Sequence, residues 1–323
     1  MAGVSLPLAD VLLSRRVQEM VLKGEEPPPL YICREGLNSA LCVYGCCAIG
    51  HGISSSILDE IRQVAREFFQ QPIEEKKKIA KGVKEFEGYG ADPVPEEGQP
   101  LDWSDRLFLD VYPEETRKSK FWPKNPAAFR MLSFQDDVEG LQVLKDEQWF
   151  TVPTVSHALL VPLGDQMEMF YEKTVLAIVA LGRCVAARRA IHSKDCDEDV
   201  HRDLQTVSVG LQARFNYYSC CQRPDLVLGL KPHADGSGYT VILQDDVEGL
   251  QVLKDEQWFT VPTVSHALLV LMGDQMEIMT NGMLKSPVHR VLTNSERERI
   301  SVAMFYTPEL KKEIGPPEGR IGQ

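Results

Sequence analysis

The chain has 323 residues, of which 43% are hydrophobic and 25% are charged, a composition typical of a soluble globular protein with room for a catalytic domain and a second lobe. Its formal net charge of -12 argues against nucleic acid as a partner, because nucleic-acid binders concentrate Lys and Arg. The chain has no recognisable secretory signal and no apolar run of the roughly 20 residues that span a membrane. We therefore expect a cytoplasmic protein without a membrane partner, whose eight cysteines are free thiols.

Residues 55–88 have the hydrophobic pattern of helices. Ile57, Ile61, Val64 and Phe68 recur at helical spacing, which predicts one apolar face packed on the rest of the protein. Three lysines at 76–78 are expected to face solvent. This part of the chain is predicted to be an N-terminal helical lobe.

The middle of the chain contains an exact internal repeat. Residues 135–161 are identical to residues 244–270, and the identity resumes at 164–168 and 273–277. Two copies separated by unrelated sequence do not make a solenoid. The first copy lacks the His-x-Asp sequence that precedes the second copy and the histidine that follows it, so it does not form a second active site. We interpret the repeat as a recent duplication, a mis-spliced transcript or a faulty gene model.

Two identical sets of strands would compete for one position in the fold, a conflict that natural sequences generally avoid. We expect the second copy to occupy that position, because only the second copy is contiguous with the remaining strands.

From residue 209 onward the sequence changes to short β-type runs broken by turn residues. Asn281-Gly282 lies between two such runs. This dipeptide is typical of a type I′ turn, which needs positive φ at both central residues. We therefore predict a hairpin that pairs residues 276–280 with residues 283–288.

The strongest chemical signal is a set of three ligand-type side chains. His233 and Asp235 are two positions apart, which in a strand places both on one face, and His289 follows across the predicted hairpin. Two histidines and one carboxylate leave coordination positions open, as in non-haem Fe(II) oxygenases. His-x-Asp alone also arises by chance.

A second pair makes the chance explanation less favourable. Arg299 and Ser301 repeat the two-residue spacing ten positions after His289. An inward-facing arginine needs an anion, and a guanidinium binds a carboxylate in bidentate fashion. Asn216 and Tyr218 share a face of an earlier strand by the same alternation, and the Tyr218 phenol can reach the same carboxylate.

Four segments carry a resemblance to a known family. They read NYY followed by RPDLVLGLKPHADGSG, then GDQME, NGMLKSPVHRV and RISVAMFY. They resemble the plant 2-oxoglutarate- and Fe(II)-dependent dioxygenases, in particular the specialised-metabolism group that includes flavonol and anthocyanidin synthases. The resemblance is dense over residues 209–309 and clear again over 50–129, where the chain reads GHGI and DWSD.

The resemblance implies a role for each matched residue. His233, Asp235 and His289 would bind Fe(II), and Arg299, Ser301 and Tyr218 would hold the distal carboxylate of 2-oxoglutarate, with Asn216 beside them. Phe305, on the strand face of Arg299 and Ser301, lines the substrate pocket or is a core aromatic. O2 would be the second co-substrate and ascorbate a reductant. The expected reaction is hydroxylation, desaturation or demethylation of a small, aromatic plant metabolite by a monomer, with release of succinate and CO2.

The implied fold class is α+β, a double-stranded β-helix (jelly-roll) barrel with an N-terminal helical lobe. We expect the lobe over residues 1–129, an anomalous segment over 130–207 that carries the duplicate, the barrel over 208–310 and a truncated tail over 311–323. The chain ends earlier than its relatives, so the site is expected to be more open to water.

Two alternatives stay open at this point. The duplication and truncation can leave a remnant that binds metal or metabolite without turnover, or the same iron site can act without 2-oxoglutarate. Other candidate ligands are weaker. His51 is interpreted as structural, His157 and His266 as exposed, and His192, Cys196 and His201 as part of a charged linker that lacks zinc-finger spacing.

Overall fold

The structure is a computed structural model of the chain. It describes residues 16–32, 40–41, 46–48, 53–82, 85–92, 100–127, 129, 142–145, 148–151, 160–161, 179–180, 209–282, 284–308 and 313–315. The predictions for His51, His157, His192, Cys196 and His201 lie outside these residues. Within them Cys220 and Cys221 are free thiols. No helix in the described part of the chain is long and apolar enough to cross a membrane.

The longest helix is α3 (Ser55–Gln70). Its N-cap residue, Ser54, accepts a hydrogen bond from the backbone N–H of Ile57 at 3.4 Å, which satisfies one of the free donors of the first turn. The helix ends before Pro72, whose ring disfavours helical backbone in the preceding residue. The remaining helices are short: α2 (Val17–Leu22), α4 (Ile73–Lys77) and α8 (Asp274–Met279), with 3-10 turns η1 (Pro29–Tyr31), η2 (Glu114–Thr116) and η3 (Ser119–Phe121).

The prediction that the lysines at 76–78 face solvent is wrong for Lys76. Lys76 is only 3% exposed, and its Nζ donates hydrogen bonds to the Gln18 side chain and to the Phe69 carbonyl, each at 2.5 Å. Burial lowers the pKa of Lys76 to about 8. Helical spacing did not predict this burial, because the partners of Lys76 come from α2 and from the end of α3.

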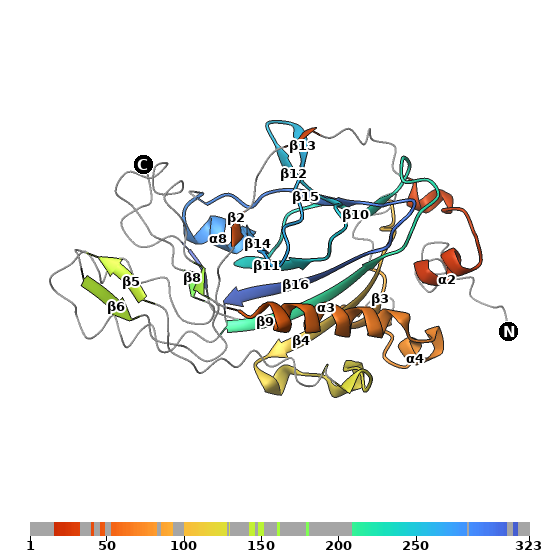
Figure 1. Cartoon of the computed structure of the whole chain (residues 1–323), viewed down its shortest axis with the longest axis horizontal. Coiled ribbons are helices and arrows are strands. Elements are labelled where there is room, and N and C mark those ends of the chain that lie inside the picture. Colours follow the sequence, from red (N-terminus) through yellow and green to blue (C-terminus); the bar gives the residue numbers. More distant parts are fainter. Residues whose placement is uncertain are drawn as a thin grey trace.

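A seven-stranded sheet forms the larger layer, and α3 runs along one of its faces (Figure 1). Side chains from alternate positions of the strands pack against Leu58, Ile61, Ala65 and Phe68 of α3, as period-two alternation requires. Its strands in order are β2 (Cys46–Ala48), β14 (Leu268–Met272), β11 (Tyr239–Gln244), β16 (Arg299–Pro308), β9 (Val209–Tyr218), β4 (Asp105–Tyr112) and β3 (Gly88–Gly90).

A five-stranded sheet forms the second layer. An apolar cluster between the sheets joins Ile242, Leu271 and Ala303 of the larger sheet to Val252 and Val291 of the smaller one. The inner faces of both sheets therefore enclose a common interior. Its strands in order are β1 (Ala40–Leu41), β13 (Gln257–Thr260), β12 (Leu250–Lys254), β15 (His289–Leu292) and β10 (Leu228–His233).

The N-terminal segment contributes strands as well as helices. β3 and β4 lie within residues 1–129, yet β4 pairs with β9 from Asp105↔Tyr217 onward. The expectation of a mainly helical segment is therefore wrong for these strands, and residues 88–90 at the end of the predicted helical stretch are strand β3.

The duplicated sequence forms the same hairpin twice. β5 (Gln142–Lys145) and β6 (Gln148–Thr151) pair in the register of their copies β12 and β13. Only β12 and β13 belong to the five-stranded sheet, whereas β5 and β6 form a separate two-stranded sheet at one end of the molecule (Figure 1). A further pair, β7 (Leu160–Val161) and β8 (Val179–Ala180), is also separate. The prediction that the second copy, and not the first, takes the contested place in the fold is confirmed for these strands.

The predicted hairpin at Asn281-Gly282 is wrong. Both residues have positive φ, 53° and 76°, but they end α8 rather than join two strands. The Gly282 N–H donates to the Glu277 carbonyl at 2.8 Å, the type of bond that closes a helix C-terminus. The dipeptide specifies positive φ, and a helix end can use that conformation as well as a type I′ turn.

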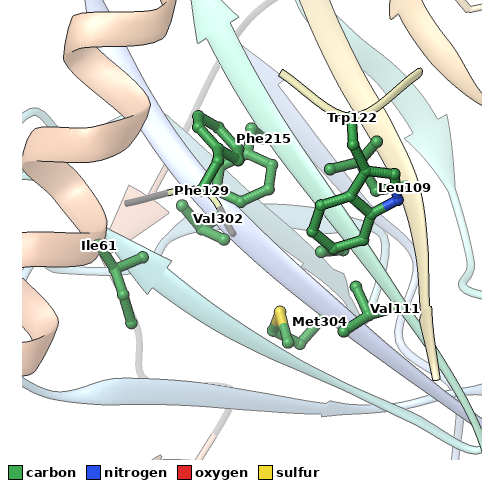
Figure 2. Close-up of a pocket in the computed structure, with 9 residues that line it drawn as sticks. Ile61, Leu109, Val111, Trp122, Phe129, Phe215, Val302 and Met304 are labelled. Atoms are coloured by element: carbon green, nitrogen blue, oxygen red, sulfur yellow. The ribbon is translucent and has the colours of Figure 1, made fainter. Parts of the chain in front are cut away.

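An apolar pocket lies between α3 and the seven-stranded sheet (Figure 2). Ile61 lines it from the helix, and Phe215, Val302 and Met304 line it from the sheet. This face is opposite to the one that carries Arg299 and Ser301, because alternate strand residues point to opposite sides. The pocket is therefore part of the packing of α3 and lies apart from the candidate site.

Candidate metal centre

His233, Asp235 and His289 lie together between the two sheets. Their ligand atoms all lie within 4.8 Å of one another. Asp235 Oδ1 is 3.5 Å from His233 Nε2 and 3.7 Å from His289 Nε2. The sequence therefore identified three residues that the fold brings to one point.

Hydrogen bonds fix the direction of both imidazoles. His233 Nδ1 lies 2.9 Å from the carbonyl oxygen of Lys231, and His289 Nδ1 lies 3.1 Å from that of Pro287. A carbonyl only accepts, so each Nδ1 carries the proton and each Nε2 presents a lone pair toward Asp235. This tautomer is the one that metal-binding histidines adopt when the other ring nitrogen donates to a carbonyl.

The carboxylate of Asp235 is oriented in the same way. Its Oδ2 accepts a hydrogen bond from Thr240 Oγ1 at 2.6 Å, which leaves Oδ1 on the side of the histidines. Burial raises the pKa of Asp235, but its polar contacts with His233, His289 and Thr240 outweigh burial and lower that pKa to about 2. Asp235 is therefore ionised at neutral pH, as a metal ligand must be.

His289 is held in its neutral form. It is 4% exposed, and burial lowers its pKa to about 4. A neutral imidazole at pH 7 binds a metal without first losing a proton. The donor set thus fits a divalent transition metal with two nitrogen ligands and one oxygen ligand.

Three elements position these ligands. β10 and β15 are neighbours and pair His233 directly with His289. Asp235 lies in the loop after β10, because the strand ends at His233, so the predicted common strand face is wrong for Asp235. The N-terminus of α8 holds this loop, where the backbone N–H of Asp274 donates to the Asp235 carbonyl at 2.7 Å.

Arg299, at the start of β16, forms a second polar site between the sheets. It is 3% exposed. Its Nε donates to the Val247 carbonyl at 3.0 Å and its Nη2 donates to Gln244 Oε1 at 2.8 Å. Its Nη1 is buried and has no hydrogen-bond partner in the part of the chain that the structure describes. A buried guanidinium with one free donor fits an anionic ligand.

The other predicted residues surround Arg299. Tyr218 lies opposite Arg299 in the pairing of β9 with β16, and Asn216 lies opposite Ser301. The Arg299 guanidinium lies 5.2 Å from the centre of the Tyr218 ring, and Asn216 Nδ2 is 3.2 Å from Ser301 Oγ. Burial raises the pKa of Tyr218 against the charge of Arg299, so its phenol stays protonated and able to donate.

Phe305 lies on the same inner face, nearer the metal ligands. It is half-buried, packs on the cluster between the sheets and stacks on Phe108 with 6.1 Å between ring centres. Its neighbour across β11 and β16 is Thr240, which holds Asp235.

Two residues that support the site were not predicted from the sequence. Thr240 supports Asp235, and Gln244 supports Arg299. Both lie on alternate positions of β11 with their side chains toward the interior, so the alternation of residues 239–244 contained the signal. His266, expected to be exposed, is half-buried and lies 3.0 Å from Asp59 of α3.

Comparison with known proteins agrees with this site. The profile of the 2OG-Fe(II) oxygenase superfamily matches residues 105–188 and 210–308, and one described as non-haem dioxygenase in morphine synthesis N-terminal matches residues 33–125. The chain belongs to the 2OG-Fe(II) oxygenase superfamily. The resemblance inferred from its motifs is confirmed.

Two curated relatives of this oxygenase are plant proteins. Protein SRG1 of Arabidopsis thaliana is 36% identical over 274 residues, which are 84% of this chain and 66% of the relative. Codeine O-demethylase of Papaver somniferum is 32% identical over 270 residues, 83% of this chain and 64% of the relative. The chain thus spans just under two thirds of the length of these proteins.

Solved structures share the fold of this oxygenase. JOX2, in complex with 2OG, Fe and JA, matches with a TM-score of 0.68 and 28% identity over 94% of this chain and 86% of that chain. The auxin-oxidising dioxygenase AtDAO1 from Arabidopsis thaliana, in complex with 2-oxoglutarate, matches with a TM-score of 0.52 and 21% identity over 83% and 85%.

Proposed function

We propose that this chain is an Fe(II)- and 2-oxoglutarate-dependent dioxygenase that hydroxylates, desaturates or demethylates a small, aromatic plant metabolite. Its two sheets are proposed to be those of a jelly-roll barrel. We also propose that it acts as a monomer in the cytoplasm.

The observation that carries this proposal is that the metal centre and the Arg299 site lie between the same two sheets. Three ligands lie together at the metal centre, of which Asp235 is ionised and His289 neutral at pH 7. A buried guanidinium lies between the same sheets, and its Nη1 has no hydrogen-bond partner among the described residues. 2-Oxoglutarate has one end that chelates a metal and another that is a carboxylate. A molecule of that kind matches both sites.

Each residue then has a defined task. His233, Asp235 and His289 would hold Fe(II), which supplies the activation of O2 when it is bound. Arg299 would bind the distal carboxylate through Nη1, with Ser301 and Tyr218 as further hydrogen-bond donors and Asn216 holding the Ser301 hydroxyl. Phe305 would contact the substrate. These groups act by binding and orientation, which supply much of the rate enhancement when the reacting atoms are well aligned.

The names of the relatives support a small plant metabolite as substrate. They include a codeine O-demethylase and a flavonoid 7-O-demethylase of Ocimum basilicum. Both names describe enzymes that remove an O-methyl group, which favours demethylation among the possible outcomes.

The test is formation of succinate from 2-oxoglutarate in the presence of Fe(II) and O2, with and without a panel of aromatic methyl ethers. Activity that His233→Ala abolishes would support the proposal. A folded protein that binds both Fe(II) and 2-oxoglutarate yet forms no succinate with any panel member would favour the catalytically impaired remnant. Fe(II)-dependent oxidation without any need for 2-oxoglutarate would favour the second alternative, in which the same iron site acts without 2-oxoglutarate.

A further inference from the structure

Residues 101–105, which include the DWSD sequence, lie beside strand β10. The Trp103 N–H donates to the Leu228 carbonyl at 2.8 Å, and the Asp102 carboxylate accepts from the Lys231 N–H at 2.7 Å. Among the described strands, β10 stands at one end of the five-stranded sheet. The segment therefore supports an edge strand, whose backbone groups need partners outside the sheet.

The pairing of β10 with β15 is irregular just before His233. Leu230 lies opposite Val291. Three residues further along β10, His233 lies opposite His289, which is only two residues from Val291. The extra residue makes a bulge, which bends a strand and changes the direction of its side chains, and Pro232 within it has no N–H to donate. The pairing with β15 therefore leaves this stretch of β10 to be fixed by other contacts.

Asp102 holds the bulge through both of its carboxylate oxygens. Oδ1 accepts from the Lys231 N–H at 2.7 Å, and Oδ2 accepts from Lys231 Nζ at 2.5 Å. The Lys231 carbonyl in turn accepts from His233 Nδ1 at 2.9 Å. Asp102 is thus joined to the His233 ring through a single residue, whose backbone and side chain it both binds.

Burial makes these contacts difficult to replace. Asp102 is 6% exposed, and the Lys231 side chain is 17% exposed. A hydrogen bond between charged groups is roughly twice as strong as a neutral one, and a buried charge that loses its partner costs free energy. Loss of the Asp102 carboxylate would therefore release Lys231 rather than exchange one partner for another.

Asp102 is itself held by the N-terminal part of the chain. The N–H of the preceding residue, Leu101, donates to the Leu30 carbonyl at 2.6 Å. The following residue, Trp103, is 1% exposed and packs edge-on against Tyr31, with 5.2 Å between the ring centres. The position of Asp102 therefore does not depend on β10 alone.

We propose that Asp102 is a positioning residue for the metal centre, which keeps the His233 ring in its binding orientation by holding Lys231. The N-terminal part of the chain thereby controls the affinity of a site whose ligands come from the C-terminal half. This inference rests on the proposed function, because it requires that His233 binds a metal.

The structure offers an internal reference and a matched control. His289 is the reference, because its Nδ1 donates to the Pro287 carbonyl at 3.1 Å and so is oriented by a different group. Asp105 is the control, because it is a buried carboxylate of the same segment, 1% exposed, that accepts from the Gln18 N–H of α2 at 2.9 Å. A merely structural effect would appear in variants of either aspartate.

The test is titration of the metal-free protein with Co(II) alone, which suits the same nitrogen and oxygen ligands as Fe(II). Visible absorption gives the affinity. Proton NMR follows the Nδ1–H signals of the two ring nitrogens, assigned by their proximity to protons of Lys231 and Pro287.

Asp102→Asn keeps an oxygen for the Lys231 N–H and should weaken Co(II) binding several-fold, whereas Asp102→Ala should weaken it roughly tenfold or more, as for other groups that support metal ligands. In both variants the His233 Nδ1–H signal should move and exchange faster with solvent, while the His289 signal stays unchanged. Asp105→Asn should lower thermal stability but leave the Co(II) affinity and both signals as in wild type.

Three results overturn the inference. Unchanged Co(II) affinity and an unchanged His233 signal in Asp102→Asn and Asp102→Ala would reject the positioning role and leave the dioxygenase proposal standing. Movement of both ring signals, or an equal loss of affinity in Asp105→Asn, would mean that Asp102 acts only through general stability. A folded wild-type protein that binds no Co(II) would reject the metal centre, and with it both the proposed function and this inference.

Discussion

Thr240 controls the orientation of the Asp235 carboxylate. Its hydroxyl donates to Oδ2 at 2.6 Å, and it is 0% exposed. Water therefore cannot replace this hydrogen bond if the hydroxyl is removed. Valine has the same branched shape as threonine, with a methyl group in place of the hydroxyl. The hydrogen bond can therefore be removed without creating a cavity.

We predict that Thr240→Val weakens Fe(II) binding roughly 10- to 100-fold, the usual effect of losing a hydrogen bond that supports a metal ligand. Fe(II) affinity is measured by anaerobic titration. Thr307→Val is the matched control, because Thr307 donates to the Gly210 carbonyl away from the metal. An unchanged Fe(II) affinity in Thr240→Val would show that Asp235 does not depend on this bond.

Lys76 provides a residue-level prediction for stability. Burial lowers its pKa in the folded protein to about 8 from 10.5, so between these values the unfolded chain binds more protons than the folded one. The free energy of unfolding should therefore rise as pH increases from 8 to 10.5, with a slope of at most about 1.4 kcal/mol per pH unit.

Urea unfolding at several pH values in this window measures that slope. Lys76→Met should reduce it, whereas the same change at exposed Lys78 should not. A slope that is identical in wild type and Lys76→Met would contradict the assigned burial of this amine.

At the scale of elements, the N-terminus of α8 holds the loop that carries Asp235. The backbone N–H groups of Gly273, Asp274 and Gln275 donate to the carbonyls of Gly238, Asp235 and Ser237. Gly273 allows this approach, because a Cβ at that position would lie 2.0 Å from the Ser237 carbonyl oxygen. No other residue type fits there without moving the loop.

Gly273→Ala should therefore displace Asp235, lower the free energy of unfolding by about 1–3 kcal/mol and weaken Fe(II) binding at least tenfold. Gly236→Ala in the same loop is the control, because a Cβ there meets no atom within 4 Å. Thermal unfolding and Fe(II) titration of both variants check this prediction. Equal behaviour of the two variants would contradict the proposed contact.

The metal ligands could be predicted from the sequence, whereas the residues that orient those ligands could not. His233, Asp235 and His289 were predictable, because their spacing and residue types define a metal site. Thr240 was hidden in a strand where a threonine is ordinary. Asp235 lies beyond the end of β10, and α8 fixes the position of its loop. Helix α8 was not predicted, because the Asn-Gly dipeptide at 281–282 was interpreted as the turn of a hairpin.

At the scale of the whole molecule, the duplication creates two chemically identical hairpins in different surroundings. β12 pairs with β15 and places Val252 opposite His289, with Val252 1% exposed. β5 pairs only with β6 among the described strands, and an isolated two-stranded hairpin is marginally stable in water. Local sequence cannot distinguish the two copies, so their different roles come from the connections of each copy.

One substitution made in both copies tests this difference. Val252→Asp buries a charge beside β15 and should lower the free energy of unfolding by more than about 3 kcal/mol, with loss of Fe(II) binding. Val143→Asp, the same change in the first copy, should alter stability by less than about 0.5 kcal/mol. Equal destabilisation in thermal unfolding would mean that both copies occupy the five-stranded sheet.

The most direct test of the whole account is anaerobic titration with Fe(II) and 2-oxoglutarate, monitored by the visible charge-transfer band of the chelated keto acid. We predict a band in wild type, its loss in His289→Ala and a large weakening of 2-oxoglutarate binding in Arg299→Gln. Arg297→Gln, which changes an exposed arginine paired with Asp246, should behave as wild type. A folded wild-type protein without this band, or a band that Arg299→Gln leaves unchanged, would contradict the assignment of the two sites to one reaction.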